Sequence, residues 1–138
     1  QDAWRCPGLL HPLDTYLVET LDMQTGLFGM APVPAPVTTE LGPGEVHHGL
    51  RTLHTPGHTP GSCCFLGEFD QGPVLISGDT LFQGGVGRTD LWGGRWDQLE
   101  ASIRRELYTL EDRTLVLPGH GPFTTIGEEA EANPFVTR

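Results

Sequence analysis

Three residues of this sequence carry metal-binding side chains, and each lies directly after a glycine behind a strand-like segment. They are His58 after LRTLHTPG, Asp79 after VLISG and His120 after TLVLPG. Imidazoles and carboxylates are the usual protein ligands of hydrolytic zinc and iron sites. A loop just past a strand can aim such a side chain while the sheet fixes its root. One such residue alone is typical of a surface turn, so the prediction of a metal centre depends on all three occurring together.

The strands that must position these side chains are predicted from short apolar runs bounded by turn residues. They are residues 50–54, 62–69, 73–77 and 114–118, preceded by a short strand within 7–12. Gly72 and Pro73 are predicted to turn the chain between the second and third of the four main strands. Residues 78–94 are predicted as a long glycine-rich loop. Alternating prolines predict an extended connector over 31–39, as a plain surface loop rather than a lid over a ligand.

Apolar periodicity predicts two helices, and a capping motif predicts the start of a third. Leucines at a spacing of four predict a helix over residues 12–21. Apolar residues at spacings of three and four predict a longer helix over 96–110. Thr124 or Thr125 is predicted to begin the last helix, and Glu128 is placed to complete a capping box with Thr125. The chain is therefore expected to have a mixed α/β (α+β) fold.

Composition limits the compartment and the partners. The net charge of −10 argues against nucleic acid and anionic membranes as partners, and no apolar run approaches the ~20 residues that span a bilayer. The cysteines are Cys6, Cys63 and Cys64, an odd number with two adjacent, which predicts reduced thiols in a cytoplasmic protein rather than disulfides. Without a C-x-x-C motif, a thiolate zinc knuckle is not expected.

The motifs together resemble the metallo-β-lactamase fold, in its glyoxalase II-like (hydroxyacylglutathione hydrolase-like) branch. The resemblance covers nearly the whole chain and depends on HTPGHTPGS, SGDTLF, GRTD and LPGHGP with TTIGEEAEANPF. It implies an αββα sandwich of two mixed sheets flanked by helices, with two metals at one edge. It also implies that His58 binds the first metal, that Asp79 bridges the two metals and that His120 binds the second. His54 matches a position that is not a ligand and is expected to be structural.

One departure from the family matters for the whole interpretation. The family's H-x-H-x-D-H loop, which lies upstream and supplies four more ligands, is absent from this sequence. His11 stands alone, and His47 and His48 lack the context of that loop. Residues 1–14 resemble the segment that follows the loop, and the sequence does not begin with Met. Residues 1–138 are therefore expected to be a single, N-terminally incomplete domain, the C-terminal portion of the sandwich, as either a fragment or a degenerate member. Uncovered strand edges and apolar faces predict poor solubility or self-association.

The function implied by the resemblance is metal-dependent hydrolysis of a thioester, with a glutathione-linked substrate as one candidate. A pair of Zn²⁺ ions is the first expectation for the cofactor, and Fe or Mn also suits a histidine–carboxylate set. Asp79 would be the catalytic carboxylate that holds the metals together. An alternative is a persulfide dioxygenase-like enzyme with one iron, although PGHGP favours the hydrolase because the dioxygenase branch resembles PAHDY there. A third hypothesis is a catalytically incomplete or decayed module.

Several residues near the predicted site have two interpretations. Arg88 and Asp90 either lie behind the ligands and orient the Asp79 loop, or form a salt bridge that braces a long loop. Phe82 and Trp92 are expected to pack under this loop rather than to line a substrate mouth. The adjacent cysteines that follow His58 are expected to belong to the strand core rather than to bind metal.

Overall fold

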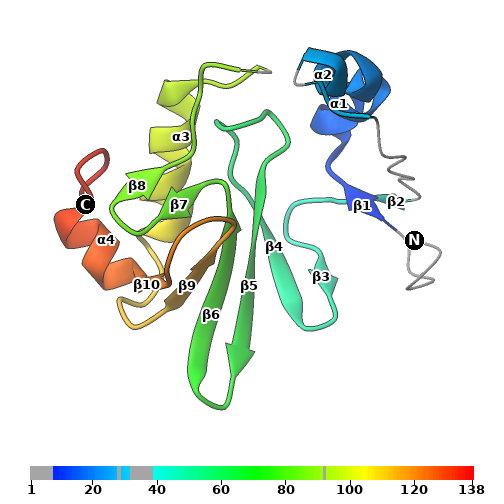
Figure 1. Ribbon diagram of the computed structural model, residues 1–138. Coiled ribbons are helices and arrows are strands. Elements are labelled where there is room, and N and C mark those ends of the chain that lie inside the picture. The colour runs from blue at the N-terminus through cyan, green and yellow to red at the C-terminus, as the bar shows by residue number, and fades with distance from the viewer. Residues whose placement is uncertain (1–7, 28, 32–38, 92) are drawn as a thin grey trace.

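The computed structural model describes residues 8–27, 29–31, 39–91 and 93–138 of the chain (Figure 1). The predictions for Cys6, for Trp92 and for most of the connector at 31–39 lie outside the described residues. Among the described helices, none is long and apolar enough to cross a membrane.

A six-stranded sheet forms the centre of the fold, with the strand order β10-β9-β6-β5-β4-β3. Its strands are β3 (Val46–His47), β4 (Leu50–His54), β5 (Cys63–Phe69), β6 (Gly72–Gly78), β9 (Leu115–Pro118) and β10 (Thr124–Thr125). Neighbouring strands are antiparallel except β6 and β9, which are parallel. Since β5 is antiparallel to both β4 and β6, the strands β4, β6 and β9 all run in one direction. Their carboxyl ends therefore meet at one edge of the sheet.

In the described part of the chain, two small pairs of strands and four α-helices complete the fold. The strands are β1 (Leu9–Leu10), parallel to β2 (Thr39–Glu40), and β7 (Leu81–Phe82), antiparallel to β8 (Gly85–Val86). The helices are α1 (Thr15–Glu19), α2 (Leu21–Leu27), α3 (Trp96–Ser102) and α4 (Ile126–Ala132). A 3₁₀ turn (Pro12–Asp14) precedes α1, and a π-helical segment (Ile103–Leu107) continues α3. Figure 1 shows α3, α4 and the β7–β8 hairpin beside β6 and β9, whereas α1 and α2 lie beyond the β3–β4 edge of the sheet, near β1.

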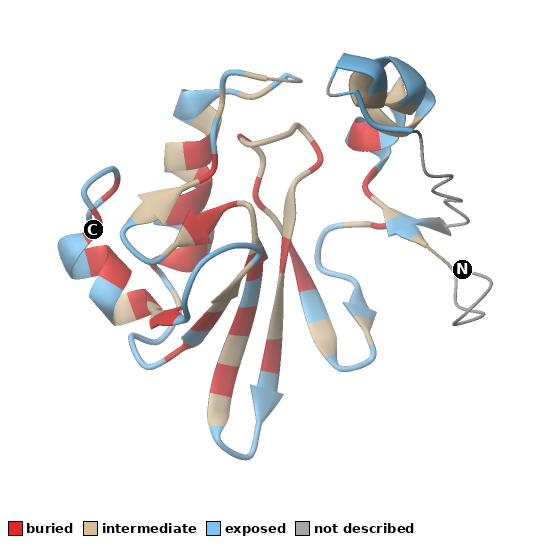
Figure 2. Ribbon diagram, viewed as in Figure 1, coloured by how far each residue is buried: buried red, intermediate tan, exposed pale blue. Residues whose placement is uncertain are grey.

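The hydrophobic core lies between one face of the sheet and the helices α3 and α4. Alternate residues of the strands point to this face because the side-chain period of a strand is two. Figure 2 shows the resulting alternation of buried and less buried residues along β6. The fully buried core side chains include Cys64, Leu75, Val116, Leu99, Ile103, Leu107 and Ile126. Burial of Leu99, Ile103 and Leu107 confirms most of the apolar spacing that predicted a helix over 96–110, although Trp96 is 42% exposed and the helical segment ends at Leu107. Burial of Ile126 places the third predicted helix against the same core.

The strand predictions are confirmed, and the connections differ in two places. The turn between β5 and β6 lies at residues 70–71, and Gly72 is already paired with Phe69 in the sheet. Within the expected loop at 78–94, the chain forms the β7–β8 hairpin with Gly84 at its turn, where φ is 63°. Strands of two residues carry no recognisable alternation, so apolar pattern does not reveal this hairpin.

The helical prediction for residues 12–21 is confirmed in type but not in continuity. A 3₁₀ turn, α1 and α2 follow one another, with a break at Thr20. The Thr20 hydroxyl donates to the carbonyl oxygen of Tyr16 at 2.7 Å, and the Thr20 amide donates to the same oxygen at 3.0 Å. Threonine side chains that bond locally in this way compete with continuation of the helix. Leu13, on the predicted apolar face, is 53% exposed. The capping box of Thr125 and Glu128 at the start of α4 is present as predicted.

The opposite face of the sheet carries apolar side chains that the described residues cover incompletely. Phe69, Ile76 and Leu115 are 53%, 39% and 38% exposed on β5, β6 and β9. They point away from the face that Leu75 and Val116 bury against the helices. Apolar surface of this kind favours association with another apolar surface.

The 138-residue chain alone is expected to self-associate through this open face, since association removes the three side chains from water. Ile76→Glu is expected to shift the chain toward monomer, because carboxylates brought together in such a contact lose hydration and repel one another. Sedimentation velocity measures the change, with Gln71→Glu in the exposed β5–β6 turn as the matched control. A monodisperse wild-type monomer with a sharp cooperative melt would contradict this expectation.

Candidate metal centre

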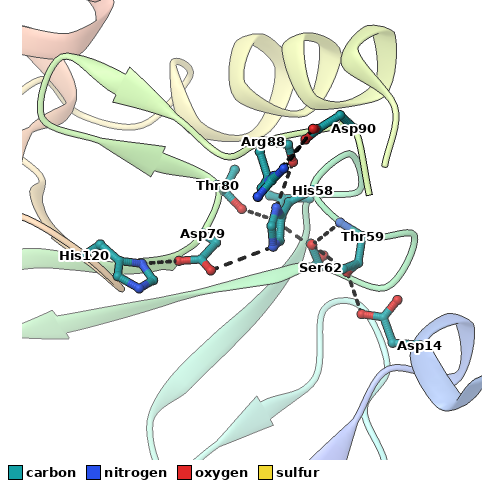
Figure 3. Close-up of polar contacts among 10 residues, drawn as sticks. Asp14, His58, Thr59, Ser62, Asp79, Thr80, Arg88, Asp90 and His120 are labelled. Carbon is teal, nitrogen blue, oxygen red and sulfur yellow. Dashed lines mark hydrogen bonds and ion pairs between the residues drawn. The ribbon is translucent and has the colours of Figure 1, made fainter. Parts of the chain in front are cut away.

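The three predicted ligands lie together where β4, β6 and β9 end, and Asp79 is the central member (Figure 3). His120 Nδ1 donates to Asp79 Oδ1 at 2.9 Å, and His58 Nε2 lies 3.8 Å from Asp79 Oδ2. Each carboxylate oxygen therefore faces a different imidazole. A cavity of about 270 Å³ opens at this point, and its lining consists of His58, Asp79, Phe82, Gly87, Arg88 and His120.

The orientation of the His58 ring is fixed by the main chain. His58 Nδ1 lies 2.8 Å from the carbonyl oxygen of Arg88. A carbonyl oxygen can only accept, so Nδ1 carries the proton in this contact. In the neutral ring the lone pair is then on Nε2, which is the nitrogen that faces Asp79. A hydrogen bond to the far nitrogen is the usual way in which proteins fix a metal-binding tautomer.

Two glycines let the chain segments of the site approach one another closely. A Cβ atom on Gly87 would collide with the carbonyl oxygen of Asp79, and it would lie 3.2 Å from Cβ of His58. A Cβ atom on Gly119, directly before His120, would lie 2.7 Å from Asp79 Oδ1. A larger residue than glycine at position 119 would therefore displace the central carboxylate from its present position. The sequence pattern of a glycine before each ligand has a steric cause at this position.

The loop that carries His58 is held by a residue that the sequence did not reveal as part of the site. The buried carboxylate of Asp14 accepts from Thr59 Oγ1 at 2.6 Å and from the Gly61 amide at 2.7 Å. Thr59 is also bonded to the hydroxyl of Ser62, at 2.8 Å (Figure 3). In the sequence Asp14 lies at the start of a predicted helix, where an aspartate is typical of a cap. The structure shows no side-chain cap from it.

His54 is the last residue of β4, directly before the loop that carries His58, and it does not line the cavity. Its ring stacks on His11 with centroids 4.2 Å apart and an interplanar angle of 10°. His54 Nε2 donates to the carbonyl oxygen of Pro60 at 2.9 Å. Burial, with a smaller effect from His54, lowers the pKa of His11. The contacts of His54 agree with the structural role expected for it.

Arg88 and Asp90 form a bidentate ion pair. Arg88 Nε and Nη2 donate to the two carboxylate oxygens of Asp90 at 2.7 and 2.8 Å. The hydrogen bond from Arg88 lowers the pKa of Asp90 to about 2. Both side chains are largely exposed, which agrees with the interpretation of a brace across the loop. The contact of this segment with a predicted ligand is made by the Arg88 carbonyl group rather than by the ion pair.

Phe82 has a different position from the one expected. It lines the cavity, and its ring meets the ring of His120 edge to face at a centroid distance of 6.1 Å. The sequence favoured packing beneath a loop, but the β7–β8 hairpin instead presents this side chain beside the predicted ligands.

The two described cysteines are free thiols. Cys64 is fully buried in the core, as expected, and burial raises the pKa of its thiol. Cys63 is half-buried, and burial raises the pKa of its thiol to about 11. Since a thiolate is the form that binds metals, these shifts disfavour the cysteines as ligands.

The donor types at the cavity suit a divalent transition metal, since two imidazoles and a carboxylate are found at hydrolytic zinc and iron sites. Among the residues that the structure describes, no group of three or more His, Cys, Asp or Glu side chains forms a cluster that could hold a metal ion. His58, Asp79 and His120 are thus brought to one cavity as a partial donor set.

Fold and site together define a mixed α/β protein with an imidazole–carboxylate centre at one sheet edge. The sequence profile of the metallo-beta-lactamase superfamily matches residues 1–120. The chain belongs to this superfamily.

Two relatives and one solved structure each match 89% or more of this chain. "Probable metallo-hydrolase YqgX" of Bacillus subtilis is 41% identical over 99% of the chain, and "Hydroxyacylglutathione hydrolase GloC" of Haemophilus influenzae is 40% identical over 89%. The crystal structure of TTHA1623 in a di-iron-bound form is 42% identical, with a TM-score of 0.86 over 98% of the chain. The chain spans 66% of YqgX, 60% of GloC and 67% of the TTHA1623 chain.

Asp14→Ala is expected to destabilise the folded chain by about 1–3 kcal/mol, because it removes the acceptor of the buried Gly61 amide and of the Thr59 hydroxyl. Exchange of the Gly61 amide hydrogen should accelerate as well, since this amide donates to Asp14. Denaturant unfolding and hydrogen exchange measure the two effects. Asp22→Ala on the exposed surface of α2 is the matched control, and equal behaviour of the two variants would contradict the role of Asp14.

Cys63 is expected to react slowly with iodoacetamide in the folded chain, because a pKa of about 11 leaves very little thiolate at pH 8. The rate should rise with pH up to this value and should increase sharply on unfolding. Mass spectrometry of the Cys6→Ser variant measures the labelling without interference from Cys6. Rapid stoichiometric labelling of the native chain at pH 8 would show that the thiol is not held in its neutral form.

Proposed function

We propose that the protein containing this chain is a metal-dependent hydrolase that cleaves a thioester. The observation that carries the proposal is the Asp79 carboxylate, which presents one oxygen toward His58 and the other toward His120. A carboxylate in this position suits a bridge between two metals. The names of YqgX and GloC support hydrolysis, and the name of GloC supports a glutathione thioester as the candidate substrate.

His58, Asp79 and His120 would hold the metals, together with donors from outside this chain. The chemistry that divalent metals supply in such a site is activation of water and polarisation of a carbonyl oxygen. Zn²⁺ is our first choice, and the di-iron form of TTHA1623 supports iron as the alternative. Mn also suits these ligands.

The residues of the chain itself orient the ligands and shape the cavity. The Arg88 carbonyl keeps the proton of His58 on Nδ1 and leaves Nε2 available for a metal. Phe82 provides an apolar wall of the cavity beside His120. The thiolate that leaves a thioester is a weak base, so the proposal requires no side-chain acid to protonate it. The free thiols of Cys63 and Cys64 support a cytoplasmic location.

Asp79→Asn in the full-length protein is expected to abolish binding of a metal pair, because the amide cannot serve as an anionic bridge. Thioester hydrolysis should fall by more than the ~10–100-fold typical of a residue that only supports the ligands. Elemental analysis gives the metal content, and release of thiol from a hydroxyacyl-glutathione gives the activity. Asp97→Asn, at the exposed start of α3, is the matched control.

The same measurements separate the competing hypotheses. One iron per chain, with oxygen consumption on a persulfide and no thiol release from a thioester, would establish the dioxygenase alternative. A folded full-length protein that takes up neither zinc nor iron and cleaves no thioester would establish the catalytically incomplete module.

A further inference from the structure

A buried carboxylate outside the metal centre receives hydrogen bonds from three different parts of the chain. Glu129 lies in α4 and is only 3% exposed. Its Oε2 accepts from the Gly84 amide at 2.9 Å and from Asn133 Nδ2 at 2.7 Å. Its Oε1 accepts from the Thr124 hydroxyl at 2.7 Å. Burial of a carboxylate without hydrogen bonds costs free energy, so the folded state strongly favours an arrangement in which these contacts are made.

The first of these contacts fixes the β7–β8 hairpin, whose two ends lie at the metal centre. Gly84 is at the turn, and Asn133 adds a hydrogen bond to the Gly85 carbonyl oxygen at 3.1 Å. Asp79 lies just before β7, and Arg88 lies just after β8. The Arg88 carbonyl group in turn orients the ring of His58. The position of the hairpin therefore determines where Asp79 lies. It also determines where the Arg88 carbonyl group, the hydrogen-bond partner of His58, lies.

The second contact fixes the loop that carries His120. Thr124 begins β10 and pairs with Val116 of β9, so His120 lies in the short connection between these two strands. The hydrogen bond from Thr124 to Glu129 attaches one end of this connection to α4. At the other end, the Gly119 amide donates to the Gly78 carbonyl oxygen at 2.8 Å, next to Asp79.

The backbone that carries Glu129 is itself held in place. The hydroxyl of Tyr108 donates to the carbonyl oxygens of Glu129 and Val136 at 3.1 and 2.7 Å. Burial raises the pKa of Tyr108 to about 12, so this hydroxyl keeps its proton at physiological pH. The capping box of Thr125 and Glu128 fixes the first turn of the same helix. Glu129 is thus rigidly attached to the core.

We infer that Glu129 is a positioning residue for the metal centre, because one buried carboxylate fixes both the β7–β8 hairpin next to Asp79 and the loop of His120. The inference rests on the proposed function for the identity of the centre. Glu129 lies in α4 and does not line the cavity, unlike the three predicted ligands, which follow the ends of β4, β6 and β9. Its role is geometric, since it sets the separation of Asp79 and His120 through their loops.

Glutamine is the informative conservative replacement at this position. Its amide oxygen can accept from Gly84 and Asn133, while its NH₂ group donates to the Thr124 hydroxyl, which accepts as well as donates. Glu129→Gln is therefore expected to keep the geometry and the affinity for metal. Glu129→Ala removes every side-chain contact, and it is expected to weaken binding of Zn²⁺ or Fe²⁺ by about 10–100-fold.

The experiment measures metal dissociation constants of the full-length protein by competition with a chelator, and amide hydrogen exchange at Gly84 and around His120. Glu131→Ala on the exposed surface of α4 is the local control, since it leaves both the capping box and the Glu129 contacts in place. Ile103→Val is the stability control, since it weakens the core without touching either loop. We expect weaker metal binding and faster exchange in Glu129→Ala, and wild-type values in Glu129→Gln and both controls.

Wild-type affinity and exchange in a folded Glu129→Ala protein would overturn the inference. If that variant does not fold, Thr124→Val decides, because it removes one donor without changing shape. It should accelerate exchange around His120 and weaken metal binding severalfold, and wild-type behaviour would again overturn the inference. If the wild-type protein binds no metal, the proposed function fails, and the exchange rates at Gly84 and near His120 still test whether Glu129 fixes the two loops.

Discussion

The parallel pairing of β6 with β9 is the constraint on which the site depends. Because β5 lies between β4 and β6 and is antiparallel to both, this pairing aligns the carboxyl ends of β4, β6 and β9. A parallel pair cannot be closed by a tight turn and needs a long crossover. The crossover consists of the β7–β8 hairpin, the segment with Arg88 and Asp90, and helix α3. The same connection that makes the pairing possible therefore builds one wall of the cavity.

Buried polar contacts convert this edge of the sheet into a defined site. Loops at strand ends have few apolar contacts of their own, so hydrogen bonds fix their conformation. Asp14 fixes the loop of His58, and Glu129 fixes the hairpin and the loop of His120. Both are carboxylates that accept from neutral donors in buried surroundings, where an unmade hydrogen bond is costly. Close packing around Gly87 and Gly119 also restricts the arrangement of the site, since a Cβ atom on Gly87 would collide with the Asp79 carbonyl oxygen and one on Gly119 would press on the Asp79 carboxylate.

Much of the fold could be predicted from the sequence, since the main strands and the helix over 96–110 have strong apolar patterns. The break at Thr20 and the β7–β8 hairpin could not, because they depend on local hydrogen bonds and on pairs of very short strands. The convergence of His58, Asp79 and His120 on one cavity agrees with the expectation drawn from three strand ends. Asp14 was missed because both of its partners, Thr59 and Gly61, are distant in sequence. Glu129 was missed because its contact with the hairpin, at Gly84, spans 45 positions. Their local contexts, at the start of a helix and within one, suggest capping or surface roles instead.

The sequence by itself determined which residues bring metal-binding chemistry and where glycines allow the chain to turn beside them. It determined these because residue type and the period of apolar positions are local properties. Only the tertiary structure decided that Asp79 lies between the two imidazoles, that the Arg88 carbonyl group selects the tautomer of His58, and that Phe82 lines the cavity. These outcomes depend on the direction of β9 relative to β6 and on contacts between residues 30 to 47 positions apart, such as His58 with Arg88 and Asp14 with Gly61.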